Sequence, residues 1–475
     1  MRTILAVLLA LPVLAGDNLL TNADFAEWKE GLPAGWKAAK GAGAPGGKES
    51  EILKGEDGGV QLGGDGSTAV WRVLSQEMSG KAEGYLRLTF EARVTGLKVE
   101  GSQFDNAWIG LAGLGDGAQP LVEARERVIS EDWTAFEMLM PQVKTPVVRV
   151  SVFLSKTGRL EARKFVLEKL APEDSAGVLL RQLGRHYSYF DLKKLDWPAM
   201  VKRHRAKLEG AADAEAFAAA ARDLLAELQD PHVYLDKPDG SRVGTFERKW
   251  ARNFDYKWVG KQLESPVQIG KVAFAGTTAD GFGVVAIGSL VLDEATAAKI
   301  VAEIDARLDA PGFIVDLRGN SGGNEKWAQE FASIFADQER VYAKARFRNG
   351  PKSNDFGQEH ERRVAPRKGK TFTKPVVVLT GPGCMSSGEG FVKAMKCLPH
   401  VTLVGLPTGG ASGNPAPVAL PNGVTVWFSR WYDMTPDGTS FEGKGIAPDI
   451  EVKQEGEGDA AFVKAVEILK EKTKK

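Results

Sequence analysis

The sequence predicts a multidomain protein with three folded regions: an N-terminal β-sandwich, a small helical bundle and a C-terminal α/β domain. Three patterns predict this architecture. Short segments of alternating apolar and polar residues come first, apolar residues at intervals of three and four follow, and nearly all-apolar strands then alternate with amphipathic helices. With 475 residues, of which 43% are hydrophobic, the chain is long enough to build several cores.

Residues 1–16 have the pattern of a secretory signal peptide. One arginine precedes an uninterrupted apolar run from Ile4 to Leu14, and the small residues Val13 and Ala15 stand before the expected cleavage point. A helix over this run is about 16 Å long, whereas the hydrocarbon core of a bilayer is roughly 30 Å thick. We therefore expect an exported protein, periplasmic or extracellular, that does not span a membrane. The alternative is an ordinary apolar segment of the N-terminal core.

Residues 17–172 are expected to form the sandwich. "YLRLTFEARVTGL" and "VVRVSVFL" alternate as strands do, and clusters of Gly, Asp and Ser separate such segments. The opening "NLLTNADFAEWKEGLPAGW" and the late "GRLEARKFVLEKL" resemble the first and last strands of galactose-binding-like jelly-roll modules, which implies a glycan or cell-surface ligand. The tryptophans here either pack in the sandwich, the simpler explanation, or stack on sugar rings. They are Trp28, Trp36, Trp71, Trp108 and Trp133.

Residues 173–244 show helical periodicity in "AGVLLRQLGRHYSYF", "DWPAMVKRHRAKLEG" and "DAEAFAAAARDLLAELQD". Asp196 and Asp213 are placed to cap two of the helix starts. Residues 245–475 then contain the buried strands "GFIVDLRG", "PVVVLTG" and "VTLVGLP" of an α/β domain whose sheet is covered on both faces. Such domains bind ligands at the carboxyl ends of their strands, where the turns "RGNSGG" and "GPGCMSSGEG" fall.

The composition excludes several classes of function. The 62 basic and 62 acidic residues cancel, so nucleic acid is not expected as the main partner. The two cysteines are Cys384 and Cys397, and a helix starting near Ser387 would separate them by about 15 Å, whereas a disulfide needs Cα atoms within about 7 Å. We expect both thiols to be free. No cluster of His, Cys and carboxylate side chains indicates a metal, and no cofactor is expected.

Two glycine-rich turns carry candidate chemistry. "GPGCMSSGEG" places Ser386 at the start of a helix, three residues before Glu389, so Ser386 is either a helix cap or a nucleophile beside the N–H groups of the helix N-terminus. "IVDLRGNSGG" has three glycines where a simple turn needs one, and glycines let a peptide N–H approach a reacting carbonyl group. We expect Asp316 and Arg318 to pair and hold this second turn.

The segment "LLAELQDPHVYL" contains the best candidate for a general base. The chain has five histidines, and His232 stands at a rigid junction, after the helix stop at Asp230-Pro231 and before a short apolar run. An imidazole readily accepts a proton near neutral pH. Glu442, in "FEGKGIAPDIEV", precedes a glycine-flanked turn, and on local grounds it is a surface carboxylate.

Together these four segments resemble, in order and spacing, the motifs of the carboxyl-terminal-processing, or tail-specific, serine peptidases over roughly residues 173–452. The resemblance implies a crotonase-like α/β core and a polypeptide substrate. It also implies that Ser386 is the nucleophile and that the N–H groups of Gly323 and Ser387 form the oxyanion hole.

The lysine-using branch of that family has its base in a "GKG" segment after the strand that here reads "VTLVGLPTGGASG". The matching position is Ala411, so a Ser–Lys dyad is excluded, and no PDZ-like segment is evident. The chain is similar instead to the tricorn-core and interphotoreceptor-retinoid-binding-protein-like branch, which implies His232 as the base and Glu442 as its support. That branch has a serine before the histidine, where this chain has Pro231.

We therefore predict an exported serine peptidase that forms an acyl-enzyme at Ser386, with the helical bundle contributing the base. Two alternatives stay open. One is a catalytically inactive protein on the same scaffold that binds a peptide, lipid or glycan. The other is a carbohydrate-binding protein in which the sandwich binds the ligand and the C-terminal region has no activity.

Overall fold

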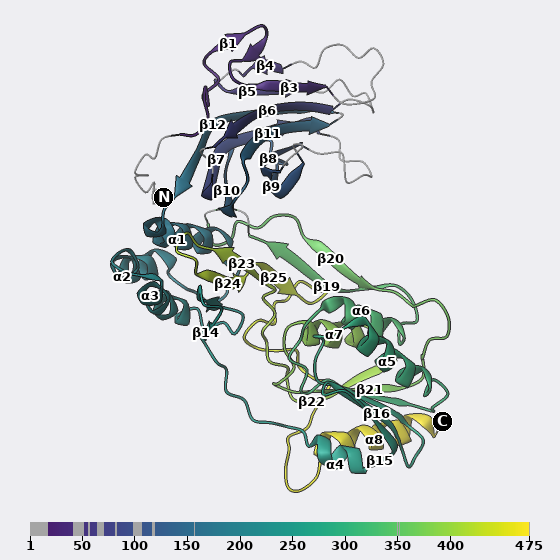
Figure 1. Ribbon diagram of the computed structural model, residues 1–475. Coiled ribbons are helices and arrows are strands. Elements are labelled where there is room, and N and C mark those ends of the chain that lie inside the picture. Colours follow the sequence, from purple (N-terminus) through teal and green to yellow (C-terminus); the bar gives the residue numbers. More distant parts are fainter. Residues whose placement is uncertain are drawn as a thin grey trace, which may run out of the picture. The chain divides into compact units, whose positions relative to one another are not determined.

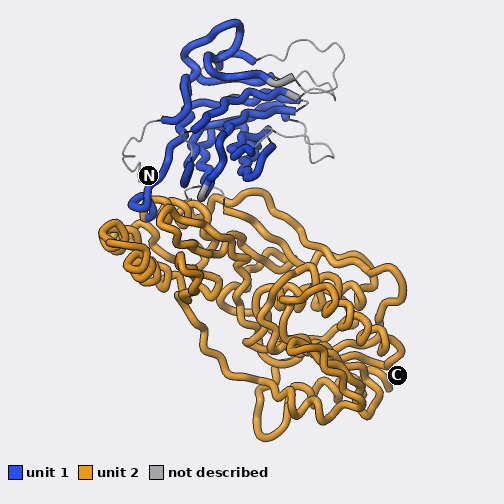
Figure 2. The backbone as a smooth tube through the Cα atoms, viewed as in Figure 1, with its two compact units in different colours: residues 1–175 blue, residues 176–475 orange. Residues whose placement is uncertain are grey.

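The computed structural model describes residues 18–40, 52–55, 58–63, 71–80, 83–97, 107–115, 119–155, 157–348, 350 and 352–474. The predicted signal peptide lies outside these residues. The chain divides into two compact units, residues 1–175 and residues 176–475 (Figure 2). No helix among the described residues is long and apolar enough to cross a membrane.

The first unit contains two five-stranded antiparallel sheets (Figure 1). Side chains alternate along its strands, so that Leu86, Leu88 and Phe90 of one sheet are buried together with Ile109 and Val150 of the other in a single hydrophobic cluster. One sheet has the order β10 (Thr134–Val143), β7 (Gly84–Thr95), β12 (Arg159–Leu170), β5 (Val60–Gly63) and β4 (Ile52–Lys54). The other has the order β3 (Lys37–Lys40), β6 (Trp71–Ser79), β11 (Val147–Ser155), β8 (Ala107–Leu114) and β9 (Pro120–Arg127), and a short pair β1 (Trp28–Lys29) and β2 (Leu32–Pro33) stands apart.

The tryptophans of this unit contact other protein groups. Trp36 is part of the hydrophobic cluster, and Trp28 packs against it. Trp108 stacks on a phenylalanine with 4.7 Å between ring centroids, and Trp133 lies between two guanidinium groups at 4.8 and 3.9 Å from its ring centroid. The Trp71 side chain is outside the described part. Packing is thus the arrangement observed for the four tryptophans whose side chains are described.

The second unit begins with three helices, α1 (Ser175–His186), α2 (Trp197–Glu209) and α3 (Ala214–Ala226). The predicted caps are confirmed, because Asp196 accepts a hydrogen bond from the Ala199 N–H and Asp213 accepts one from the Ala216 N–H. A four-stranded sheet follows, in the order β14 (Arg242–Gly244), β13 (Tyr234–Asp236), β24 (Thr425–Ser429) and β23 (Pro415–Ala419). This sheet pairs strands from both sides of residue 245, so the helical region and the α/β region form one structure.

A seven-stranded sheet is the centre of the second unit. Its order is β15 (Leu263–Ile269), β16 (Ala273–Thr278), β17 (Gly283–Ile287), β18 (Phe313–Asp316), β21 (Val376–Thr380), β22 (Val401–Gly405) and β26 (Ile450–Glu451). The strands from β17 to β26 are mutually parallel. A three-stranded antiparallel sheet, β20 (His360–Val364), β19 (Arg340–Phe347) and β25 (Trp431–Met434), lies in the same unit.

Helices cover both faces of the seven-stranded sheet, as its all-apolar strands predict (Figure 1). Val315 and Val378 face a core shared with α5 (Glu294–Asp305), α6 (Glu325–Ser333) and α7 (Ser387–Lys396). Ile314 and Val377 face a second core shared with α4 (Tyr256–Lys261) and α8 (Ala460–Thr473). The strands β18 and β21 are neighbours, so the turns that lead from them into α6 and α7 meet at one edge of the sheet.

Candidate active site

Ser386 occupies the turn between β21 and α7 in a backbone conformation that side chains rarely adopt. Its φ is 56° and its ψ is −128°, and its side chain makes no capping hydrogen bond. Among the described residues its hydroxyl has no hydrogen-bond partner, and the side chain is partly exposed. The helix-cap explanation is therefore wrong. An uncommitted serine on a strained strand-to-helix turn is the geometry of a nucleophile elbow.

Glu389 does not complete a capping box, because its carboxylate bonds to another segment. It accepts hydrogen bonds from Thr408 Oγ1 at 2.6 Å, Gly410 N at 2.6 Å and Ala411 N at 2.9 Å. Burial raises its pKa to about 7, against the lowering effect of these donors. The Ser386 N–H in turn donates to the Ala411 carbonyl oxygen at 2.7 Å. Residues 408–411 are thus tied to the first turn of α7, next to the serine.

The second glycine turn lies directly against Ser386. A Cβ on Gly322 would lie 2.7 Å from the Ser386 Cβ and 3.1 Å from the Ser387 nitrogen, so only glycine permits this approach. The Ser387 hydroxyl donates to the Gly323 carbonyl oxygen at 2.7 Å. Within the described chain, neither the Gly323 N–H nor the Ser387 N–H has an acceptor. The two N–H groups that the sequence predicts for an oxyanion hole are therefore uncommitted and lie in the two segments that meet at Ser386.

The predicted pair of Asp316 and Arg318 holds this turn, with a third partner that the sequence did not indicate. The Arg318 guanidinium is fully buried, and its Nε lies 3.0 Å from Asp316 Oδ1. Its Nη1 donates to Asp459 Oδ1 at 2.6 Å and to the Asn253 carbonyl oxygen at 2.9 Å. Asp459 is also the N-cap of α8, so the last helix of the chain anchors the catalytic edge of the sheet.

His232 lies between the end of α3 and the start of β13. Its backbone N–H donates to Asp230 Oδ1 at 2.9 Å, and its Nδ1 lies 4.0 Å from the same oxygen. The ring is 13% exposed, and Nδ1 is buried without a hydrogen-bond partner. Burial lowers the pKa of His232, Asp230 raises it and Lys193 lowers it, with the net shift downward. The ring is therefore neutral near pH 7, as a general base must be.

Glu442 is buried, so its interpretation as a surface carboxylate is wrong. Its Oε2 accepts hydrogen bonds from Ser412 N at 2.9 Å and Ser412 Oγ at 3.0 Å, and that hydroxyl lies 2.9 Å from the Tyr189 hydroxyl. Burial and the neighbouring Asp230 raise the pKa of Glu442 to about 8. Among the described residues, no hydrogen bond joins His232 to Ser386 or to Glu442. The structure thus brings Ser386, Ser387 and Gly323 together, whereas His232 and Glu442 belong to a separate group that Asp230 and Lys193 connect.

That group contains residues that the sequence analysis missed as functional. Asp230 is fully buried and its Oδ2 accepts hydrogen bonds from Tyr187 at 3.1 Å and Ser429 at 2.8 Å. The Lys193 Nζ lies 3.5 Å from Glu442 Oε1 and 3.9 Å from Asp230 Oδ2. Asp230 lies two residues before His232 in the sequence but was interpreted as a helix stop, whereas no local pattern marks Lys193.

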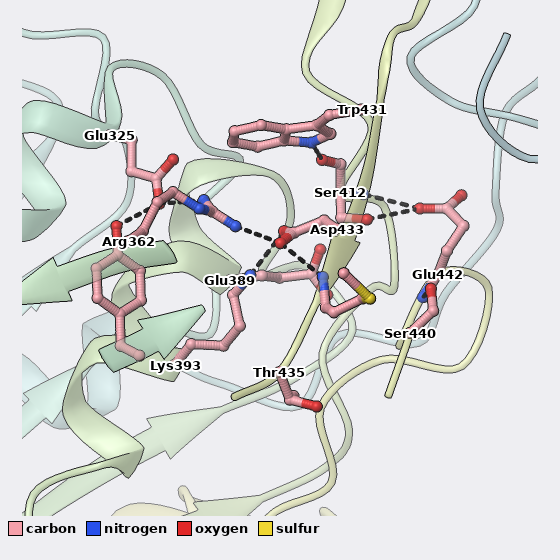
Figure 3. Close-up of polar contacts among 12 residues, drawn as sticks. Glu325, Arg362, Glu389, Lys393, Ser412, Trp431, Asp433, Thr435, Ser440 and Glu442 are labelled. Carbon is pink, nitrogen blue, oxygen red and sulfur yellow. Dashed lines mark hydrogen bonds and ion pairs between the residues drawn. The ribbon is translucent and has the colours of Figure 1, made fainter. Parts of the chain in front are cut away.

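Lys393, on α7, is the lysine nearest to Ser386 in the sequence, and its ammonium group belongs to an ionic group with Asp433, Arg362 and Glu325 (Figure 3). It donates to Asp433 Oδ2 at 2.6 Å. Arg362 bonds to the other Asp433 oxygen and to Glu325 at 2.5 Å. Figure 3 also shows Ser412 between this group and Glu442. Both cysteines are free, and no group of three or more metal-binding side chains occurs in the described part of the chain.

Comparison with known proteins places this geometry in context. Residues 281–452 match peptidase family S41. The carboxy-terminal processing protease CtpA of Bacillus subtilis is 31% identical over 162 residues, 34% of this chain and 33% of that protein. CtpB of the same organism is 27% identical over 173 residues, 36% of this chain and 34% of that protein. The matched region spans about a third of the length of these curated relatives.

A solved structure covers more of the chain. A protein from Parabacteroides merdae, described provisionally as a peptidase, has a TM-score of 0.55 and 26% identity. The match covers 63% of this chain and 97% of that one. The region matched to the family contains Gly323, Ser386 and Glu442, and His232 precedes it.

Proposed function

We propose that the protein is an exported serine peptidase that hydrolyses polypeptides. Residues 281–452 match peptidase family S41, and part of the chain is similar to the carboxy-terminal processing proteases CtpA and CtpB, which supports the proposal. One observation carries the proposal. Among the described residues, the hydroxyl of Ser386 has no hydrogen-bond partner, and neither the Gly323 nor the Ser387 N–H beside it has an acceptor; Ser386 itself stands on a strained turn.

The reaction is acyl transfer through an ester of Ser386. The serine Oγ attacks the scissile carbonyl carbon while His232 takes its proton through Nε2, since Nδ1 is buried. The N–H groups of Gly323 and Ser387 stabilise the oxyanion. As the tetrahedral intermediate collapses, the C–N bond breaks and the leaving amine takes the proton from His232. Water then hydrolyses the ester by the same steps, and His232 acts again as the base.

Glu442 supports the site indirectly in this mechanism. It bonds to Ser412 and not to the imidazole, so it stabilises the segment next to Ala411, which binds the Ser386 N–H. The hydrogen bond between His232 and Ser386 forms when substrate is bound, because catalytic hydrogen bonds commonly tighten only in the enzyme–substrate complex. No lysine replaces the imidazole, since position 411 is alanine and Lys393 is paired with Asp433.

Ser386→Ala tests the proposal. We expect hydrolysis of an unfolded fluorogenic polypeptide to fall by more than about 1,000-fold, because the nucleophile is lost while the fold is kept. A fluorophosphonate probe should label the wild-type protein at Ser386 and leave the variant unlabelled. Ser333→Ala, which changes a serine on α6, should keep full activity. Undiminished hydrolysis by the Ser386→Ala protein would exclude this mechanism.

A second candidate function is favoured by the missing contact between His232 and Ser386 and by Pro231 at the position before the histidine. A binding protein on the same scaffold would bind a peptide, lipid or glycan and hydrolyse nothing. The fluorophosphonate probe distinguishes the peptidase from the binding protein, because it labels only an activated serine. A binding protein would stay unlabelled and would still bind an unfolded polypeptide.

For the first unit, we propose the galactose-binding-like β-sandwich that the sequence indicates. Its two sheets share one hydrophobic cluster, which supports the proposal. Binding of a glycan array by the full-length protein, lost on Trp133→Ala, is the test of a glycan ligand.

A further inference from the structure

Lys193 lies in the turn between α1 and α2 and connects three separate segments of the second unit. Its Nζ donates to the carbonyl oxygens of Leu228 at 3.1 Å and Gln229 at 3.2 Å, which directly precede Asp230. The same nitrogen lies 3.5 Å from Glu442 Oε1 and 3.9 Å from Asp230 Oδ2. One ammonium group therefore contacts both the turn that leads to His232 and the two buried carboxyl groups.

The two carboxyl groups have unequal hydrogen bonding. Asp230 accepts bonds from the Tyr187 and Ser429 hydroxyls and from the His232 N–H. Glu442 Oε2 is bonded to Ser412, but its buried Oε1 has no hydrogen-bond partner. In the described part of the chain, Lys193 is the one lysine or arginine that forms an ion pair with either carboxyl group.

The remaining titratable groups that face this cluster add no positive charge. Tyr187 and Tyr189 are fully buried, and burial raises the pKa of both hydroxyls well above the usual range, so they stay protonated. His232 is neutral for the reasons given above. Glu442, with its pKa raised to about 8, is mostly protonated near neutral pH. Removing the Lys193 charge would thus leave the buried Asp230 carboxylate with no cation, which is strongly unfavourable.

We propose that Lys193 is a positioning residue of the peptidase site, which clamps the turn that presents His232, balances the charge of Asp230 and contacts the Glu442 carboxyl group. The inference rests on the proposed function, because His232 is the base only if the protein is a serine peptidase. Lys193 does not touch the substrate in this mechanism. It acts through the imidazole and its neighbours.

The charge of Lys193 has an effect on His232 that the packing of its side chain would not have. The positive charge of Lys193 opposes protonation of His232, whereas the negative charge of Asp230 favours it. Without Lys193, burial still lowers the pKa of His232 and Asp230 still raises it, but one lowering effect is lost, so the pKa rises. Since the base must be neutral, the ascending limb of the pH–activity profile then moves to higher pH.

The experiment compares Lys193→Met, which keeps the length of the side chain without its charge, with Lys193→Arg, which keeps the charge. We expect Lys193→Met to lower kcat by about 10- to 100-fold, up to the contribution of a general base, with KM nearly unchanged. Its ascending pH limb should move upward, and Lys193→Arg should restore most of the kcat and the wild-type limb. Lys202→Met, at an exposed position on α2, is the matched control and should change neither.

A second measurement does not depend on activity. The pKa of His232 can be followed by NMR of protein labelled at histidine, with the His232 signal assigned by its absence in His232→Gln. We expect a higher pKa in Lys193→Met than in wild type. If Lys193→Met does not fold, Lys193→Met with Glu442→Gln removes one of the two buried carboxyl groups that Lys193 contacts, and the same two measurements are made on that protein against Glu442→Gln alone.

Three results would overturn the inference: an unshifted His232 pKa, an unshifted pH limb in a folded Lys193→Met protein, or a Lys193→Arg protein no better than Lys193→Met. Failure of the proposed function looks different. In that case wild-type protein neither hydrolyses polypeptide nor reacts with fluorophosphonate, while the NMR titration still reports whether Lys193 controls His232.

Discussion

Two buried ionic groups lie on either side of Ser412, and they differ in charge balance. The closed cluster, Lys393, Asp433, Arg362 and Glu325, has two cations and two carboxylates (Figure 3). The open cluster is Lys193, Asp230 and Glu442, with one cation for two carboxyl groups. Trp431 joins them, because its ring lies 4.2 Å from the Arg362 guanidinium and its Nε1 donates to the Ser412 carbonyl oxygen.

The comparison shows how charge balance affects the protonation of buried carboxyl groups. Burying an ion is costly unless it is paired, and the closed cluster pairs each of its charges. The open cluster has one cation for two carboxyl groups, and burial together with the neighbouring Asp230 raises the pKa of Glu442 to about 8. Strongly shifted pKa values of this kind concentrate at functional sites. The open cluster is also the one that contacts the His232 segment.

The largest expected effect comes from breaking the closed cluster. Asp433→Asn keeps the shape of the side chain but leaves Lys393 and Arg362 without their shared carboxylate, so we expect the free energy of unfolding to fall by about 3–5 kcal/mol. Calorimetry of the second unit's transition measures the loss. Asp437→Asn, at an exposed position, should stay within about 0.5 kcal/mol of wild type. If Asp433→Asn lowered the free energy of unfolding no more than Asp437→Asn does, the closed cluster would not be structural.

The open cluster should make the stability of the protein depend on pH. The unfolded chain releases the Glu442 proton near pH 4.5, whereas the folded protein holds it up to about pH 8, so this carboxyl group makes stability fall as pH rises through that window. Glu442 lowers the free energy of unfolding by at most about 1.4 kcal/mol per pH unit. Denaturation of Glu442→Gln at several pH values should show a shallower fall than wild type. Glu455→Gln, at an exposed position, should retain the wild-type slope, and parallel curves for Glu442→Gln and wild type would contradict the expected pKa.

The smallest expected effect is on the pH dependence of activity. Because burial lowers the pKa of His232, the ascending limb of kcat/KM should have its midpoint below the ordinary histidine value of about 6.5. Asp230→Asn removes the charge that favours the protonated ring, so it should move the midpoint lower still, opposite to Lys193→Met. Steady-state kinetics between pH 4.5 and 8 measures both. A midpoint above 6.5 in wild type, or a shift upward in Asp230→Asn, would contradict this assignment of the base.

Local patterns predicted the parts of this protein that depend on neighbouring residues. Asp196 and Asp213 cap their helices, and the strands around Ile314 and Val377 are covered on both faces. The glycine turn beside Ser386 was also predicted. The role of Ser386 was not decided, because the spacing to Glu389 fits a capping box equally well. The structure excludes the capping box, because the Glu389 carboxylate is turned toward Thr408 and residues 410–411.

By itself, the sequence determined which segments form strands and helices, which strands are buried, and where a missing side chain lets two turns touch. These properties follow from side-chain spacing and backbone freedom along the chain. Only the tertiary structure decided that Lys193, Asp230 and Glu442 share one buried space, and that Glu442 contacts Ser412 and not His232. Burial and charge balance depend on distances in space, and these three residues come from segments that no local pattern connects.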